Sequence, residues 1–122
     1  MPKRWKKIRG TKLFLFPLRI YSSKQIIMRT LLKVTVDTTT GNKTLTDGSL
    51  QNLIKSTMEL IKPEAAYFLP YEGKRTALFV FDLKNSGDMI KIGEPIFQIL
   101  NAELEYMPIM NAEELANGLA SM

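Results

Sequence analysis

The sequence predicts an α+β fold in which four strands and two main helices follow one another in βαββαβ order. Two observations lead to this prediction. Residues 30–36 and 102–110 alternate apolar and polar side chains as strands do, whereas residues 49–61 and 88–100 carry apolar side chains every three or four positions. The length of 122 residues, with 45% hydrophobic and 24% charged side chains, supports one domain with a modest core.

The first strand and the first helix are separated by a segment rich in Thr. We expect a strand at residues 30–36, then a loop at residues 37–42 and at most a short helical turn at residues 43–47. Ser49 is the expected N-cap of a helix that runs to about Ile61. The apolar stripe of this helix consists of Leu50, Leu53, Ile54, Met58 and Ile61.

The second and third strands form a hairpin. Residues 64–69 and 75–83 are the two strands, and residues 70–74 are the turn, in which Gly73 supplies a positive φ. The third strand is apolar almost throughout, which is typical of a central strand covered on both faces.

The second helix contains a proline. It begins at Ser86 or Asp88, and Pro95 removes an internal hydrogen bond, so we expect a break near residues 93–94 and a restart at Pro95. The fourth strand follows at residues 102–110.

A short last helix follows the fourth strand. It begins at Asn111 with a pattern that resembles a capping box and ends at Gly118.

This order of elements predicts a ferredoxin-like sandwich with an antiparallel sheet of strand order 4-1-3-2 and both helices on one face. The other face stays open. We assign to it Leu31, Lys33, Thr35, Arg75, Ala77, Phe79, Phe81, Glu103, Glu105 and Met107. A face this apolar predicts a homodimer in which the two open faces stack.

Several segments of the domain carry a resemblance to a known group of proteins, namely residues 32–36, 41–42, 47–50, 62–68, 73–77, 94–95 and 101–110. In these segments the domain resembles small bacterial proteins of the dimeric α/β-barrel (ferredoxin-like) superfamily that have no assigned activity. The resemblance implies a dimer. Its more distant members include muconolactone isomerases, antibiotic-biosynthesis monooxygenases, haem-degrading enzymes and stress-responsive proteins, so it does not imply one reaction.

Absent residue types restrict the chemistry. Without Cys or His, the chain has no thiolate nucleophile, no disulfide, no imidazole ligand and no Ser-His-Asp triad. We therefore expect no cofactor and no metal site, and any acid or base must be Asp, Glu, Lys or Tyr.

Three charged residues of the open face are the catalytic candidates. Lys33, Glu103 and Glu105 come from adjacent strands, and a carboxylate desolvated by apolar neighbours could act as an acid or a base. The alternative is a cross-strand pair between Lys33 and a glutamate that serves only the dimer.

Three further residues are candidate ligand contacts. Tyr67 offers a hydroxyl, Arg75 a cation for a carboxylate, and Phe79 an aromatic surface. The alternatives are a structural role in the core for Tyr67 and a solvated position at the end of the hairpin for Arg75.

The charge is uneven along the chain. Residues 1–27 carry eight basic residues and no acidic one, whereas residues 28–122 carry nine basic and 12 acidic residues, a net charge of −3. We expect residues 1–27 to be a disordered extension or to lie upstream of a true start at Met28. A signal or anchor, a transit peptide and a nucleic-acid-binding arm remain the alternatives.

These features predict a cytoplasmic, homodimeric protein that binds a small apolar molecule or serves in a stress response. We expect neither nucleic acid nor a membrane as its main partner. The alternative is a cofactor-free isomerase or monooxygenase that acts on a small aromatic or lactone-like substrate.

Overall fold

The computed structural model describes residues 5–8, 11–14 and 27–122. Strands β1 (Trp5–Ile8) and β2 (Thr11–Phe14) pair with each other in antiparallel orientation. Most of residues 1–27 lie outside the described residues. The interpretation of this segment as an extension or as sequence upstream of a true start therefore stays a prediction.

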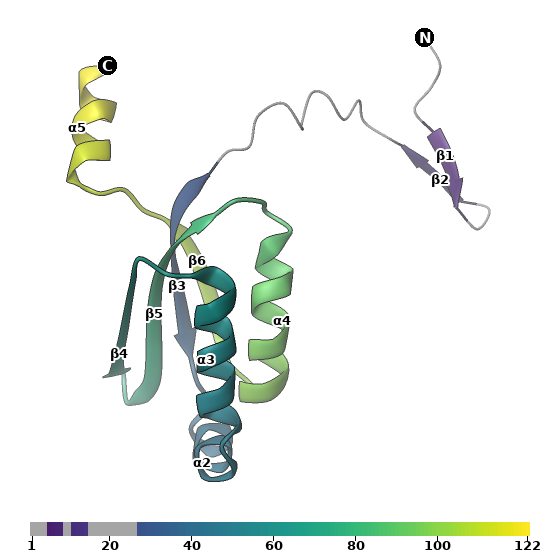
Figure 1. The fold of residues 1–122 in the computed structure, drawn as a ribbon, viewed down its shortest axis with the longest axis vertical. Coiled ribbons are helices and arrows are strands. Elements are labelled where there is room, and N and C mark those ends of the chain that lie inside the picture. Colours follow the sequence, from purple (N-terminus) through teal and green to yellow (C-terminus); the bar gives the residue numbers. More distant parts are fainter. Residues whose placement is uncertain (1–4, 9–10, 15–26) are drawn as a thin grey trace.

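Residues 27–122 form an α+β domain (Figure 1). Its elements are β3 (Met28–Thr35), α2 (Thr38–Asp47), α3 (Ser49–Ile61), β4 (Ala65–Tyr71), β5 (Lys74–Leu83), α4 (Asp88–Leu100), β6 (Glu103–Pro108) and α5 (Ala112–Ala120). The four strands make one antiparallel sheet in the order β4-β5-β3-β6. This is the predicted order read from the opposite edge, so the α+β class and the order of the antiparallel sheet are confirmed.

One face of the sheet is covered by α3 and α4, which lie side by side over it (Figure 1). Alternate residues of β3 are buried beneath these helices, and Leu32 is wholly inaccessible to solvent. The core consists mainly of Leu32, Val34, Leu50, Leu53, Phe79, Phe81, Ile92, Ile96 and Leu100. The central strand and the two helices therefore make one hydrophobic core.

The predicted faces of β5 are reversed. Leu32 lies opposite Phe79 and Val34 lies opposite Ala77, so these β5 residues share the helix-covered face with the core of β3. The same alternation places Arg75 there, together with Phe81. The prediction that these four residues lie on the open face is wrong, because both faces of this strand are apolar and only its register with β3 distinguishes them.

The predicted loop at residues 37–42 is mostly the first part of helix α2. The Asp37 carboxylate caps this helix, since it accepts hydrogen bonds at 2.9 Å from both the backbone N–H and the hydroxyl of Thr40. At Gly41 an added Cβ would lie 2.8 Å from an Arg75 guanidinium nitrogen. A close contact with β5 thus stabilises a helix whose Thr-rich sequence has low helix propensity.

The predicted break near residues 93–94 is also wrong, because α4 is continuous with Pro95 inside it. The buried stripe of α4 extends past the proline and offsets the loss of one backbone hydrogen bond. At Gly93 an added Cβ would lie 3.2 Å from the Tyr106 hydroxyl oxygen, so α4 packs closely on β6. That hydroxyl donates to the Met89 carbonyl at 2.9 Å, and burial raises the pKa of Tyr106 to about 12.

The remaining elements lie where predicted, although the hairpin turn is shorter than residues 70–74 and α5 ends at Ala120 rather than at Gly118. The β4–β5 hairpin turns through Glu72 and Gly73, which both have positive φ, as a type I′ turn requires. Helix α3 ends at Ile61 as expected, although its N-cap is Gly48 rather than Ser49. Helix α5 begins with a complete capping box at Asn111.

The core predicts the effect of truncating its central side chain. Leu32→Ala should lower the free energy of unfolding by about 2–5 kcal/mol, because the surrounding helices cannot close the cavity completely. Leu60→Ala, at a side chain of α3 that is 58% exposed, should cost less than about 1 kcal/mol. Urea unfolding followed by circular dichroism measures both, and equal losses would contradict this description of the core.

The cap of α2 predicts a pH dependence. Hydrogen bonds from the backbone and side chain of Thr40 hold the pKa of Asp37 below its ordinary value of 3.8. The stability that Asp37 contributes is therefore complete above that value and is lost as the pH falls through the lower, folded-state pKa.

Asp37→Asn keeps a capping oxygen but cannot titrate. Its free energy of unfolding should therefore fall less steeply than that of the wild type between about pH 5 and about pH 2. Asp82→Asn, at an exposed side chain on β5, is the matched control and should keep the wild-type slope. Urea titrations at several pH values measure the slopes, and an unchanged slope for Asp37→Asn would refute the role of this cap.

Candidate functional site

The predicted candidates lie on two opposite sides of the sheet. On the open face, Lys33 lies opposite Glu105 and Thr35 lies opposite Glu103 across the β3–β6 pair. Tyr67 on β4 shares this face, because it lies opposite Leu78. Four of the six candidates, Lys33, Glu103, Glu105 and Tyr67, are thus on the open face.

Lys33 is held by an aromatic ring and a carboxylate. Its Nζ lies 4.3 Å from the centroid of the Tyr71 ring and 4.0 Å from Oε1 of Glu105. The Glu105 side chain is 59% exposed, and an ion pair of this length and exposure contributes little to stability. The arrangement is the cross-strand pair considered as the alternative to catalysis, and a catalytic role for these residues stays a prediction.

Glu103 lies at the end of the sheet. It borders a pocket of about 240 Å³ together with Asp37, Lys74 and Asn101. The carboxylates of Glu103 and Asp37 and the ammonium of Lys74 make this a polar depression. Such a lining suits water or a small polar group better than an apolar substrate.

The other two candidates, Arg75 and Phe79, lie beneath the helices. Both line a pocket of about 440 Å³ between α3 and the β4–β5 hairpin. The side chain of Phe68, which is 54% exposed, forms one wall and meets Phe79 edge to face at a centroid distance of 5.8 Å. Other apolar side chains that line the pocket are Val34, Leu50, Leu53, Ile54 and Ile96.

Arg75 is the charged residue of this apolar pocket. One guanidinium nitrogen donates to Oδ1 of Asn42 at 2.9 Å, and the group packs against Gly41 of α2. Among the described residues, no carboxylate lies within ion-pair distance of it. A guanidinium has five N–H donors, and the bond to Asn42 uses one of them.

Sequence reasoning did not find the pocket itself. Its outer wall exists because β4 is an edge strand that the helices do not cover fully. The available signal was the sequence of β4, which carries aromatic side chains on both faces. Tyr67, Phe68 and Tyr71 are all exposed.

Within residues 27–122 and the short strands β1 and β2, we find no helix of the length and hydropathy that a membrane crossing requires. The same residues contain no group of three or more acidic side chains that could hold a metal ion. No protein-family model, no curated protein and no solved structure matches this chain.

Proposed function

We propose that this protein is a homodimeric binding protein of the ferredoxin-like, dimeric α/β-barrel type, and that each protomer holds a small apolar molecule with an acidic group. The main support is the pocket of about 440 Å³ in which Arg75 is the charged residue. The dimer is supported by the composition of the open face.

The size and lining of the pocket suit a small organic molecule. Pockets that bind such ligands measure about 300–1,000 Å³ and combine apolar walls with a few polar groups. Burying about 200 Å² of apolar ligand surface would contribute roughly 5 kcal/mol before the entropy of association is subtracted. This gain is large enough for binding without a metal or a covalent bond.

Arg75 determines the polarity of the ligand. A guanidinium binds a carboxylate or a sulfonate through paired, charge-assisted hydrogen bonds. Asn42 accepts one N–H and thereby orients the group. Because the cation borders an apolar space and lacks a carboxylate partner in the described residues, an anionic ligand group gains more here than a neutral one.

The open face favours a second copy of the chain. Half-buried apolar side chains from three strands lie at its centre, namely Leu31, Leu78, Val80 and Met107. Exposed Tyr67 and Leu69 extend this surface across β4. Stacking two such faces removes the apolar surface from water, as in two-layer sheet sandwiches.

The other function predicted from the sequence is a cofactor-free isomerase or monooxygenase that uses Glu103, Glu105 and Lys33. A general acid or base works best when its surroundings bring its pKa near the working pH. The exposure of Glu105 and its pairing with Lys33 favour a structural role instead. We therefore propose binding rather than catalysis.

Filling the pocket should abolish binding. The probes are 8-anilino-1-naphthalenesulfonate, which is anionic, and N-phenyl-1-naphthylamine, its neutral counterpart without the sulfonate. Ile54→Trp places an indole in the pocket and should weaken both probes at least tenfold in a fluorescence titration. Ile90→Trp, the same change at an exposed position of α4, should leave both affinities within about twofold.

Arg75→Gln tests how much the charge of the guanidinium contributes to ligand binding. It should weaken the anionic probe about tenfold or more and leave the neutral probe nearly unchanged, because only the sulfonate pairs with the guanidinium. Equal affinities of the wild type and Ile54→Trp would refute the pocket. Equal losses for the two probes in Arg75→Gln would refute the preference for an acidic ligand.

A charge on the open face should dissociate the dimer. Val80→Lys places an ammonium at the centre of the proposed interface and should raise the dimer dissociation constant at least tenfold in sedimentation equilibrium. Ile90→Lys, at an exposed position of α4, is the matched control and should not change it. A wild-type protein that stays monomeric at high concentration would contradict the dimer.

A further inference from the structure

Helix α5 is amphipathic, and no other element in the described part of the chain makes extensive contact with it. None of its residues is buried, and Leu115 and Leu119 are 48% and 59% exposed. These two leucines are four positions apart and therefore share one side of the helix. A helix of nine residues is marginal in water unless it packs against another surface.

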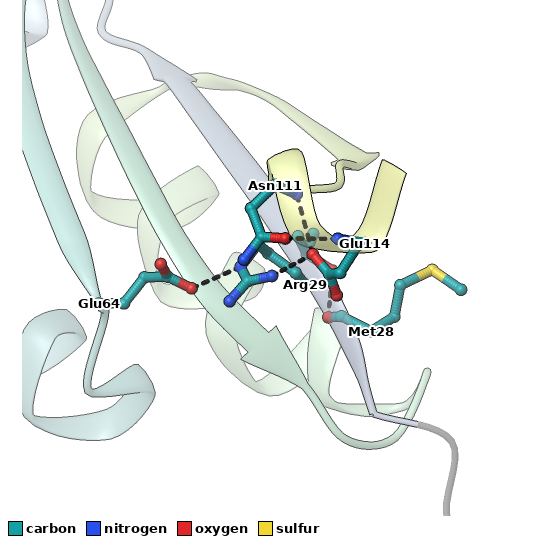
Figure 2. Close-up of polar contacts among 6 residues, drawn as sticks. Met28, Arg29, Glu64, Asn111 and Glu114 are labelled. Carbon is teal, nitrogen blue, oxygen red and sulfur yellow. Dashed lines mark hydrogen bonds and ion pairs between the residues drawn. The ribbon is translucent and has the colours of Figure 1, made fainter. Parts of the chain in front are cut away.

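The first turn of α5 is nevertheless fixed to the domain (Figure 2). Arg29 on β3 donates from Nε to Glu64 at 2.7 Å and from a terminal nitrogen to Glu114 of α5. Glu114 also accepts the Asn111 backbone N–H at 2.9 Å, while the Asn111 side chain accepts the Glu114 backbone N–H at 2.8 Å. We call these four residues the Arg29 cluster.

The Arg29 cluster directs α5 away from its own core. Arg29 lies opposite Asp82 and belongs to the open face, so α5 starts on that side of the sheet. From there the helix extends beyond the end of the sheet, far from α3 and α4 (Figure 1). Its leucines cannot reach the core of the same protomer in this position.

We propose that α5 is an arm that packs on the β4 edge of the open face of a second copy of this chain, beside the stacked centres of the two faces. This inference depends on the dimer proposed above and identifies the surfaces that complete its interface. In this arrangement, Leu115 and Leu119 pack against the partner copy.

The area of the open face supports this arm. Four strands about 4.8 Å apart and seven residues long give a flat footprint of roughly 450 Å² per protomer. Stable interfaces bury about 800 Å² on each partner. A nine-residue helix about 14 Å long adds roughly 140 Å² to the area that its own protomer buries, whereas the surface that receives it is already part of the open face. The arms therefore supply part of the area that stacking alone lacks.

Charge and exposure identify the edge of the face that receives α5. The helix carries Glu113 and Glu114 and no basic residue. The β6 side of the open face carries Glu103 and Glu105, which would repel it. The β4–β5 side instead offers exposed Tyr67, Leu69 and Tyr71, with Lys74 beside them.

Two measurements test the arm in the full-length chain. In sedimentation equilibrium, Leu115→Glu/Leu119→Glu should raise the dimer dissociation constant at least tenfold. Leu60→Glu/Ile90→Glu, which changes two exposed apolar residues on α3 and α4, should leave it within about twofold. Far-ultraviolet circular dichroism and thermal unfolding establish that both variants fold.

Cross-linking gives a second readout that leaves the leucine pair largely intact. The chain has no Cys, so each introduced thiol is the only one. Leu119→Cys mixed with Tyr67→Cys should yield a disulfide-linked dimer that contains one chain of each variant. Leu119→Cys mixed with Ile90→Cys should not yield such a mixed dimer.

The outcomes separate the arm from the dimer itself. A wild-type monomer at all concentrations would overturn both proposals. A wild-type dimer with an unchanged dissociation constant in Leu115→Glu/Leu119→Glu and no mixed cross-link would overturn only the arm. A weakened dimer together with the Leu119–Tyr67 cross-link would establish it.

Discussion

The structure depends on one constraint, which is that two helices cover only one face of a four-stranded sheet. In β3, alternate side chains such as Leu32 and Val34 are buried beneath α3 and α4. The side chains between them, including Leu31 and Lys33, have no helix above them. Every candidate surface of the domain follows from this division, because each residue of a strand must lie on one side or the other.

The helix layer is also narrower than the sheet. Edge strand β4 is therefore only partly covered, and Phe68 stands exposed beside the buried ring of Phe79. The space between them and α3 is the apolar pocket. Strand alternation brings Arg75 to the same side, where α2 contacts it through Gly41 and Asn42. The incomplete cover of β4 thus explains the cavity, and the alternation along β5 explains why Arg75 is its charged residue.

The open face carries the ion pairs of Lys33 and Arg29, and the ion pair of Arg29 connects this face to α5. Lys33 contacts the Tyr71 ring and the Glu105 carboxylate within the sheet. Arg29, near the start of β3, instead binds Glu114 in the first turn of α5. These basic residues of β3 thus bind acidic partners from different elements. The open face is therefore organised by charge around an apolar centre, which is the pattern that a specific interface requires.

The sequence by itself determined the α+β class, the strand order and the common face of Lys33, Glu103 and Glu105. It could do so because β3 and β6 alternate apolar and polar residues, and such alternation specifies one face without reference to the rest of the chain. The turn at Gly73 and the cap at Asn111 were equally local, since each depends on residues within one turn.

Tertiary structure alone decided the rest. The faces of β5 depended on its register with β3, because Phe79 and Leu78 are both apolar and the strand itself favours neither side. Helix α2 depended on contact between Gly41 and Arg75, which are far apart in sequence. Helix α4 continued through Pro95 because the side chains buried along one side of it extend past the proline. The pocket depended on the relative widths of two layers. Local patterns do not encode such quantities, because they arise only when separate elements pack together.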